Sequence, residues 1–192
     1  MAKVNIVVLD RDGVINEDSD AYIKSAEEWQ AIPGSIDAIV KLCNCGFRVF
    51  VVTNQSGIGR GLFDTNTLQE MHDKMNHQVE EAGGKIERIF HCPHTPVDGC
   101  DCRKPATGML DKLERYLDKS IDGAFFIGDS LSDMQLALIK NCQPLLVLTG
   151  KGSLTRNEAD ISANHIPMFS DLAAASNFIL NDSGTTSCTV NS

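Results

Sequence analysis

The chain has 192 residues, a length typical of one domain that is large enough to bury a hydrophobic core. Its formal net charge of -9 argues against a nucleic-acid-binding protein, because contact with a phosphate backbone requires a basic surface. The sequence shows no apolar run long enough to span a membrane and no signal-peptide pattern, so we expect a cytoplasmic protein without membrane contact.

Apolar segments typical of strands alternate along the chain with segments of helical periodicity. The predicted strands are residues 4–9, 47–53, 85–91, 124–128 and 144–149, with a short addition at 168–169. The predicted helices are residues 34–45, 65–82, 108–117, 131–140 and 171–180. This alternation predicts a three-layer α/β fold with a mostly parallel sheet, because right-handed crossovers place helices on both faces.

The domain organisation follows from the same pattern. We expect residues 1–181 to form a single domain without a large cap domain, because the connections between elements are short. The polar residues 182–192 are predicted to form a flexible tail. No apolar surface seam is evident, so we expect a monomer.

Two aspartates, Asp10 and Asp12, follow the first predicted strand. Alternate residues of an extended chain face the same side, so both carboxylates can face one site at the carboxyl end of the sheet. A divalent cation would neutralise such a pair. The alternative is a strand-ending turn with two solvated acids.

Three further polar segments are expected, like Asp10 and Asp12, at the ends of successive predicted strands: residues 53–54, 103–104 and 128–133. Together they give, in order, Asp-x-Asp, a strand-ending Thr, a Lys and Gly-Asp-x-x-x-Asp. This ordered set resembles the signature of the haloacid dehalogenase superfamily of phosphohydrolases, over residues 6–133. The resemblance implies a Rossmann-like sheet with the reaction at its carboxyl edge.

The resemblance also implies roles for the matching side chains in phosphoryl transfer. Asp10 would be the nucleophile that forms an aspartyl-phosphate, and Asp12 the general acid and base. Thr53 and Lys104 would bind the transferring phosphoryl group, because this chemistry depends on positioning and charge neutralisation.

A catalytic Mg²⁺ is implied by the same resemblance. Asp10, the backbone carbonyl of Asp12 and Asp129 would be its ligands, since Mg²⁺ prefers oxygen. Asp133 would hold a metal-bound water or position Lys104.

Cys92, His94, Cys100 and Cys102 lie within eleven residues of each other. Three thiols and one imidazole suit a closed tetrahedral Zn²⁺ site of structural type. A disulfide pairing is the alternative, but it needs an oxidising compartment and leaves His94 unexplained. Zinc would fix the small loop that leads directly into residues 103–104.

The seven cysteines are an odd number, and only three are bunched, which disfavours a disulfide framework. We interpret three of the scattered cysteines as small structural residues with reduced thiols: Cys43, Cys45 and Cys142.

Within the superfamily, a zinc loop joined to Arg-Lys-Pro resembles two groups, the heptose bisphosphate phosphatases and the histidinol phosphate phosphatases. Residues 10–16, 22–23 and 53–61 resemble the heptose enzymes. The five-residue spacer 95–99 is instead similar to histidinol phosphatases, and Ser130 stands where some heptose enzymes have a Lys. The resemblance implies hydrolysis of the C7 phosphate of a heptose 1,7-bisphosphate, a step toward lipopolysaccharide core precursors.

A bisphosphate substrate needs a second anion site, for which Arg103 is the first candidate and Arg60 the second. Further substrate contacts are predicted at Asp18, Ser19, Asp20, Ala21, Asn54, Gln55, Ser56 and Ser130. A solvated acidic loop is the alternative for residues 18–21. The alternative functions are a histidinol phosphate phosphatase, another small sugar phosphatase, and a catalytically inactive, metal-stabilised binding protein.

Overall fold

Six parallel strands form the centre of the fold in the computed structural model, which describes residues 5–182. The strands are β1 (Ile6–Leu9), β2 (Arg48–Asn54), β3 (Ile86–Cys92), β4 (Phe125–Gly128), β5 (Gln143–Val147) and β6 (Met168–Phe169). Their order is β3-β2-β1-β4-β5-β6, and every neighbouring pair is parallel. The predicted α/β fold with a parallel sheet is therefore confirmed.

Each predicted helix is present, with ends shifted by at most two residues. The helices are α1 (Ser35–Asn44), α2 (Ser56–Gly59), α3 (Thr65–Glu81), α4 (Gly108–Leu117), α5 (Leu131–Ile139), α6 (Gly152–Thr155), α7 (Ala159–Ala163) and α8 (Leu172–Asp182). The short α2, α6 and α7 were not predicted, because four or five residues are too few to show a helical period. Helix α8 includes residue 182, and the rest of the predicted tail lies outside the described residues.

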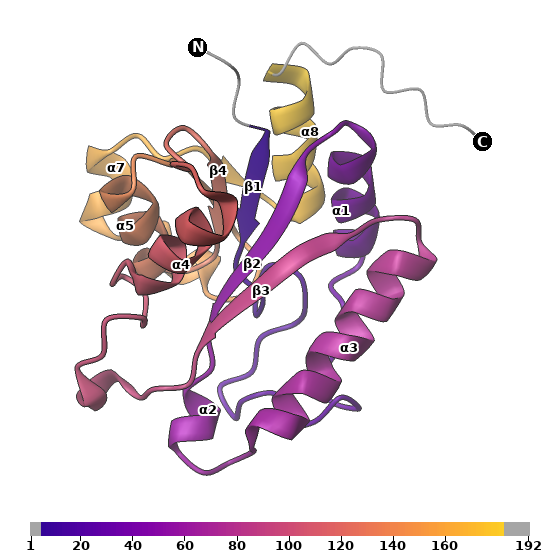
Figure 1. Cartoon of the computed structure of the whole chain (residues 1–192). Coiled ribbons are helices and arrows are strands. Elements are labelled where there is room, and N and C mark those ends of the chain that lie inside the picture. The colour runs from indigo at the N-terminus through magenta and orange to yellow at the C-terminus, as the bar shows by residue number, and fades with distance from the viewer. Residues whose placement is uncertain (1–4, 183–192) are drawn as a thin grey trace.

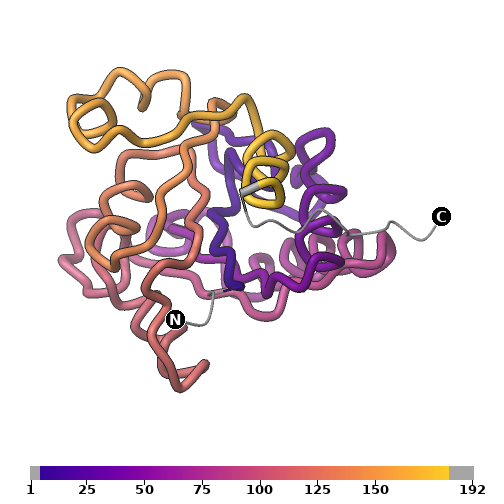
Figure 2. Tube along the Cα trace, turned by 90° about the horizontal axis from the view of Figure 1, so that it is seen from above, coloured from indigo at the N-terminus to yellow at the C-terminus, as the bar shows by residue number. Residues whose placement is uncertain are grey.

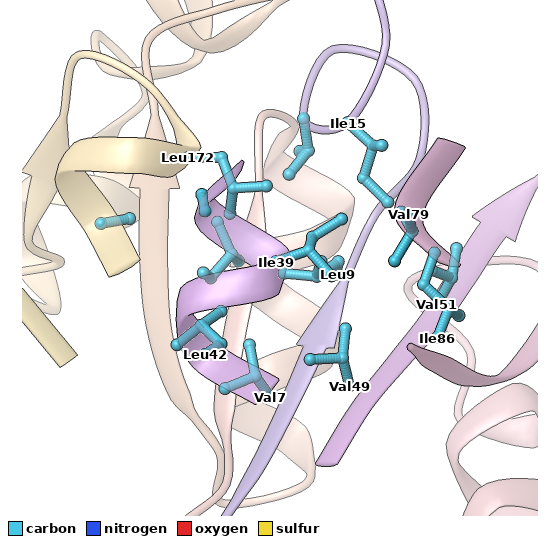
Figure 3. Close-up of a cluster of buried hydrophobic side chains, with 14 of the residues drawn as sticks. Val7, Leu9, Ile15, Ile39, Leu42, Val49, Val51, Val79, Ile86 and Leu172 are labelled. Carbon is cyan, nitrogen blue, oxygen red and sulfur yellow. The ribbon is translucent and has the colours of Figure 1, made fainter. Parts of the chain in front are cut away.

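Alternation along the strands builds two cores, one on each face of the sheet (Figure 1). Val7 and Leu9 of β1 pack with α1, α3 and α8, whereas Ile6 and Val8 pack with α4 and α5. Figure 2 shows α8, in yellow, beside α1, in purple, at one face of the sheet. Figure 3 shows Ile39 and Leu42 of α1 lying against the strand residues of this core. The three layers predicted from the sequence are thus present.

The chain order places the carboxyl end of the central strand β1 between those of β2 and β4. The loops that follow these strands gather at the lower edge of the sheet in Figure 1. None of the helices within residues 5–182 is both long and apolar enough to cross a membrane.

The scattered cysteines differ from one another. Cys43 and Cys142 carry free thiols, as predicted. Cys45 is disulfide-bonded, so the prediction of a reduced thiol is wrong at that position.

Candidate active site

Asp10 lies directly after β1, where its backbone N–H donates to the carbonyl of Ile127 in β4 at 2.9 Å. Its Oδ1 lies 2.8 Å from the Nζ of Lys104, and the same Nζ lies 2.6 Å from Oδ1 of Asp133. The ammonium also donates to the carbonyl of Val52 at 3.1 Å. Lys104 is therefore held in one place, between two buried carboxylates and a strand carbonyl, and the contact with Asp133 matches the second of the two roles considered for that residue.

A third carboxylate completes this cluster. One oxygen each from Asp10, Asp129 and Asp133 lie within 4.8 Å of one another. Asp129 accepts a hydrogen bond from the backbone N–H of Lys151 at 2.7 Å, and Asp133 accepts from the N–H and hydroxyl of Ser130 at 3.0 and 2.6 Å. One lysine cannot neutralise three buried acids, so this oxygen-rich cluster suits a divalent cation.

Burial and mutual repulsion raise the pKa values of two of these acids, Asp10 and Asp129. Burial raises the pKa of Asp10 to about 7 against the pull of Lys104, and Asp133 adds to the rise. Burial, followed by the charges of Asp10 and Asp133, raises the pKa of Asp129 to about 8. A bound cation would replace these protons, because metal binding requires ionised ligands.

This arrangement predicts a pH-dependent stability for the Mg²⁺-free protein. Between pH 6.5 and 8 the folded Asp10 and Asp129 still hold protons that the unfolded chain has released, so the contribution of these two acids to the free energy of unfolding falls as pH rises. The window starts at 6.5 because burial lowers the pKa of His72 to about 3, and the contribution of this histidine, which rises with pH at lower values and opposes that of the two acids, is complete above its ordinary pKa. The slope is at most about 1.4 kcal/mol per pH unit and proton.

Thermal unfolding at pH 6.5 and 8 is compared without and with Mg²⁺, because the Cys100 thiol, whose pKa is, against the effect of desolvation, lowered to about 7 by hydrogen bonds, titrates in the same range. Added Mg²⁺ should raise the Tm more at pH 8, because fewer protons must then leave the site. An equal Mg²⁺ effect at both pH values would contradict the prediction.

Two glycines pack against the Asp129 carboxylate, and Gly13 is the closer. Gly13 has a φ of +79°, and a Cβ there would lie 2.1 Å from Oδ2 of Asp129. Gly13→Ala is therefore expected to displace this carboxylate, weaken Mg²⁺ binding and lower kcat/KM by about tenfold or more, a cost of about 1.4 kcal/mol. Gly46→Ala is the matched control: its φ of +81° gives similar backbone strain, but nothing lies within 4 Å of the added Cβ. Equal losses in both variants would show that strain alone is responsible.

Asp12, the second acid of the motif, ionises more easily than Asp10. Its carboxylate accepts hydrogen bonds from Arg11, from the side-chain amide of Asn16 at 2.9 Å and from that of Gln55 at 2.7 Å. Against the effect of burial, Arg11 and these two amides lower the pKa of Asp12. The two acids of the Asp-x-Asp motif thus lie in different electrostatic surroundings, and without a bound cation Asp12 is the one that ionises first.

Residues at the end of β2 and just after it form hydrogen bonds with both Asp12 and Lys104. Thr53 is buried, and its hydroxyl accepts a hydrogen bond from the amide of Gln55 at 2.8 Å. Asn54 accepts from the backbone N–H of Lys104 at 3.0 Å. The strand end therefore fixes both the hydroxyl and the loop that carries the lysine.

A pocket of about 350 Å³ opens above this cluster, and the four predicted catalytic residues line it. Nine of the ten predicted substrate residues also line it: Asp18, Ser19, Asp20, Asn54, Gln55, Ser56, Arg60, Arg103 and Ser130. Ala21 is exposed and does not line the pocket. The lining also contains residues not predicted from the sequence: Arg11, Tyr22, Ile23, Ser132 and Lys151.

Cationic side chains stand around the pocket. The guanidinium of Arg60 lies over the ring of Tyr22, 5.9 Å from its centroid. Arg103 donates to the carbonyl of His94 at 3.3 Å, which ties it to the cysteine loop. The unpredicted Lys151 follows β5, so the rule that applied to the other strand ends would have found it.

The second predicted cluster is assembled as well. The Sγ atom of Cys102 lies 3.0 Å from that of Cys92, 3.6 Å from that of Cys100 and 3.2 Å from Nδ1 of His94. Ligands of a tetrahedral Zn²⁺ lie about 2.0–2.3 Å from the metal, and therefore roughly 3.5–3.8 Å from one another. Two of the contacts of Cys102, at 3.0 and 3.2 Å, are shorter than this, whereas the number and kinds of ligand atoms are compatible with zinc.

This cysteine loop is joined to the pocket by backbone hydrogen bonds. The N–H of Gln55 donates to the carbonyl of Cys92 at 2.7 Å, and that of Gly59 to the carbonyl of Pro93 at 3.0 Å. A metal that fixes the loop would thus also fix the pocket wall.

A parallel sheet with these motifs at its carboxyl edge defines a haloacid dehalogenase-type phosphohydrolase. The model of the polynucleotide kinase 3 phosphatase family matches residues 5–166. A D-glycero-beta-D-manno-heptose-1,7-bisphosphate 7-phosphatase from Pseudomonas putida is 48% identical over 171 residues, which cover 89% of this chain and 97% of the relative. The chain belongs to this family of heptose bisphosphate phosphatases.

Solved structures agree with the sequence relatives. The D,D-heptose 1,7-bisphosphate phosphatase from B. bronchiseptica, complexed with magnesium and phosphate, has a TM-score of 0.86 and 44% identity. The match covers 92% of this chain and 98% of that chain. The corresponding Escherichia coli enzyme is 39% identical, with 79% of this chain and 83% of the relative covered.

Proposed function

We propose that this protein hydrolyses the C7 phosphate of D-glycero-β-D-manno-heptose 1,7-bisphosphate and leaves the C1 phosphate in place. The observation that carries the proposal is the buried contact of Asp10 with Lys104, beside Asp129, at the bottom of a pocket with cations around it. The names of the relatives supply the sugar and the β anomer. The product would be a precursor of the heptose in lipopolysaccharide cores.

In the first step, a carboxylate oxygen of Asp10 attacks phosphorus while the bond from phosphorus to the C7 oxygen breaks. Asp12 gives its proton to that oxygen. In the second step, water attacks the phosphorus of the aspartyl-phosphate, Asp12 takes its proton, and the bond to Asp10 breaks. The leaving C7 oxygen and the attacking water oxygen occupy the same position in turn, and Asp12 must be within hydrogen-bond reach of it in both steps.

The surrounding residues neutralise the charge of the phosphoryl group. Lys104 and the Thr53 hydroxyl would bind its oxygens. Asp10, the backbone carbonyl of Asp12 and Asp129 would hold Mg²⁺, which supplies positive charge to the phosphoryl oxygens when bound. The magnesium and phosphate in the B. bronchiseptica structure support this assignment.

The second phosphate would be bound by Arg103, with Arg60 beside it, because a guanidinium fork matches phosphate geometry. Asp18, Ser19 and Asp20 would contact sugar hydroxyls from the loop that lines the pocket. Asn54, Gln55, Ser56 and Ser130 would complete the contacts. Ala21 stays a prediction that the pocket lining does not support.

We further propose that Cys92, His94, Cys100 and Cys102 hold a structural Zn²⁺. The observation that supports this proposal is a cluster of four ligand atoms, three thiols and one imidazole, within 4.8 Å of one another. A monomeric, cytoplasmic enzyme with one domain over residues 1–181 remains our proposal for the molecule as a whole.

A substrate panel tests the function. Phosphate release should be fastest with the β anomer of heptose 1,7-bisphosphate, slower with the α anomer, and at least about 100-fold lower in kcat/KM with histidinol phosphate, because the latter leaves the second anion site unfilled. An oligonucleotide 3′-phosphate belongs in the panel because of the family name, but a net charge of -9 disfavours it. Equal rates for histidinol phosphate would overturn the proposal.

A further inference from the structure

Arg11, between the two aspartates of the motif, is a buried cation without a role in the chemistry described so far. Its exposed fraction is 1%, although it stands beside a polar pocket. Burying a guanidinium is costly unless its donors are satisfied, so its partners indicate what holds it there.

The hydrogen-bond partners of the Arg11 guanidinium are the carboxylate of Asp12 and the side-chain amide of Gln55. Nε donates to Oδ1 of Asp12 at 3.1 Å, and Nη2 donates to Oδ1 and Oδ2 at 2.9 and 3.1 Å. Nη2 also donates to Oε1 of Gln55 at 3.1 Å. On the side of α3, the Sδ of the buried Met71 lies 3.9 Å from Nη1.

The contact with Gln55 fixes which way that amide points. Because Oε1 accepts from Arg11, the Nε2 group faces the pocket and donates to Oδ2 of Asp12 at 2.7 Å and to the hydroxyl of Thr53 at 2.8 Å. Arg11 thus restrains Asp12 directly, and a second time through Gln55.

We propose that Arg11 is a positioning residue that holds the Asp12 carboxyl group where it can exchange a proton with the leaving oxygen. The inference rests on the proposed role of Asp12. In the first step, the acid proton moves to the leaving oxygen as the phosphorus–oxygen bond breaks and the bond to Asp10 forms. The carboxylate that remains on Asp12 is the species that the guanidinium stabilises.

Leaving groups of different basicity test this role. An alkyl phosphate needs a proton on its leaving oxygen, whereas a nitrophenyl phosphate does not, so only the former depends on a positioned acid. The parameter to measure is kcat/KM, because it ends with departure of the leaving group and excludes hydrolysis of the aspartyl-phosphate. The ratio of the two kcat/KM values is also independent of the fraction of protein that is folded.

Arg11→Met is expected to lower kcat/KM about 10- to 100-fold with the alkyl phosphate and less than about threefold with the nitrophenyl phosphate. Arg11→Lys keeps the charge without the fork and should recover part of the loss. Met71→Leu perturbs the packing against Arg11 at similar volume and should change the ratio little.

Asp12→Asn distinguishes a failure of the proposed acid, Asp12, from a failure of the positioning role of Arg11. If it shows the leaving-group dependence and Arg11→Met lowers both substrates equally, Arg11 is only structural and the inference is wrong. If Asp12→Asn itself shows no such dependence, the proposed acid is wrong, and the positioning role falls with it.

Discussion

Asp10→Asn is expected to abolish phosphate release, with kcat/KM falling by at least about 10⁴-fold. The change removes the nucleophile, and loss of a covalent nucleophile costs on the order of 10⁴ to 10⁶ in rate. Asparagine has nearly the shape of aspartate, and Lys104 keeps its contact with Asp133, so the fold should persist. The rate loss would therefore report chemistry and not unfolding.

A second measurement identifies the group that accepts the phosphoryl. Rapid acid quenching of the unsubstituted enzyme with labelled substrate should give an acid-stable, alkali-labile acyl phosphate on Asp10, and Asp10→Asn should give none. Asp37→Asn is the control, because Asp37 is exposed on α1 and away from the pocket. Turnover by Asp10→Asn within tenfold of the unsubstituted rate would overturn the covalent mechanism.

The fold was predictable because the strands are rich in apolar residues and each long helix has an apolar stripe. β1 shows this: Ile6 and Val8 face one core while Val7 and Leu9 face the other, so the strand reads as continuously hydrophobic. The strand predicted at 144–149 ends early, at Val147. Two residues further on, the Thr149 hydroxyl donates to the carbonyl of Gly13 at 2.6 Å.

The site was predictable where a motif follows a strand, and not where a contact depends on tertiary packing. Asp10 and Asp129 follow β1 and β4, Thr53 lies in the last part of β2, and parallel topology brings these strand ends together. The hydrogen bonds from the Arg11 guanidinium to Asp12 could not be predicted from the sequence. The orientation of an arginine side chain between two acids depends on tertiary packing, here against Met71 of α3. The disulfide-bonded state of Cys45 also carries no local sequence signal.

Cys102→Ser is expected to abolish zinc binding, to lower the Tm and to reduce kcat/KM by more than tenfold. Cys102 is 5% exposed and its Sγ lies within 3.6 Å of the three other ligand atoms of the cluster. Serine is a poor Zn²⁺ ligand, and metal binding energy in such loops is folding energy. The loop can detach while the sheet stays folded, so we expect a loss of roughly 3 to 5 kcal/mol, or on the order of 10 °C in Tm.

The activity loss follows from the path between the two clusters. Arg103 is tied to the carbonyl of His94, and the N–H of Lys104 to Asn54, so a released loop frees the cation that faces Asp10. Cys142→Ser is the matched control: this thiol is similarly buried, at 6%, but lies outside the cluster. It should keep one zinc per chain by elemental analysis and lose only about 1 kcal/mol of stability. Retention of zinc and activity in Cys102→Ser would show that the loop is held without the metal.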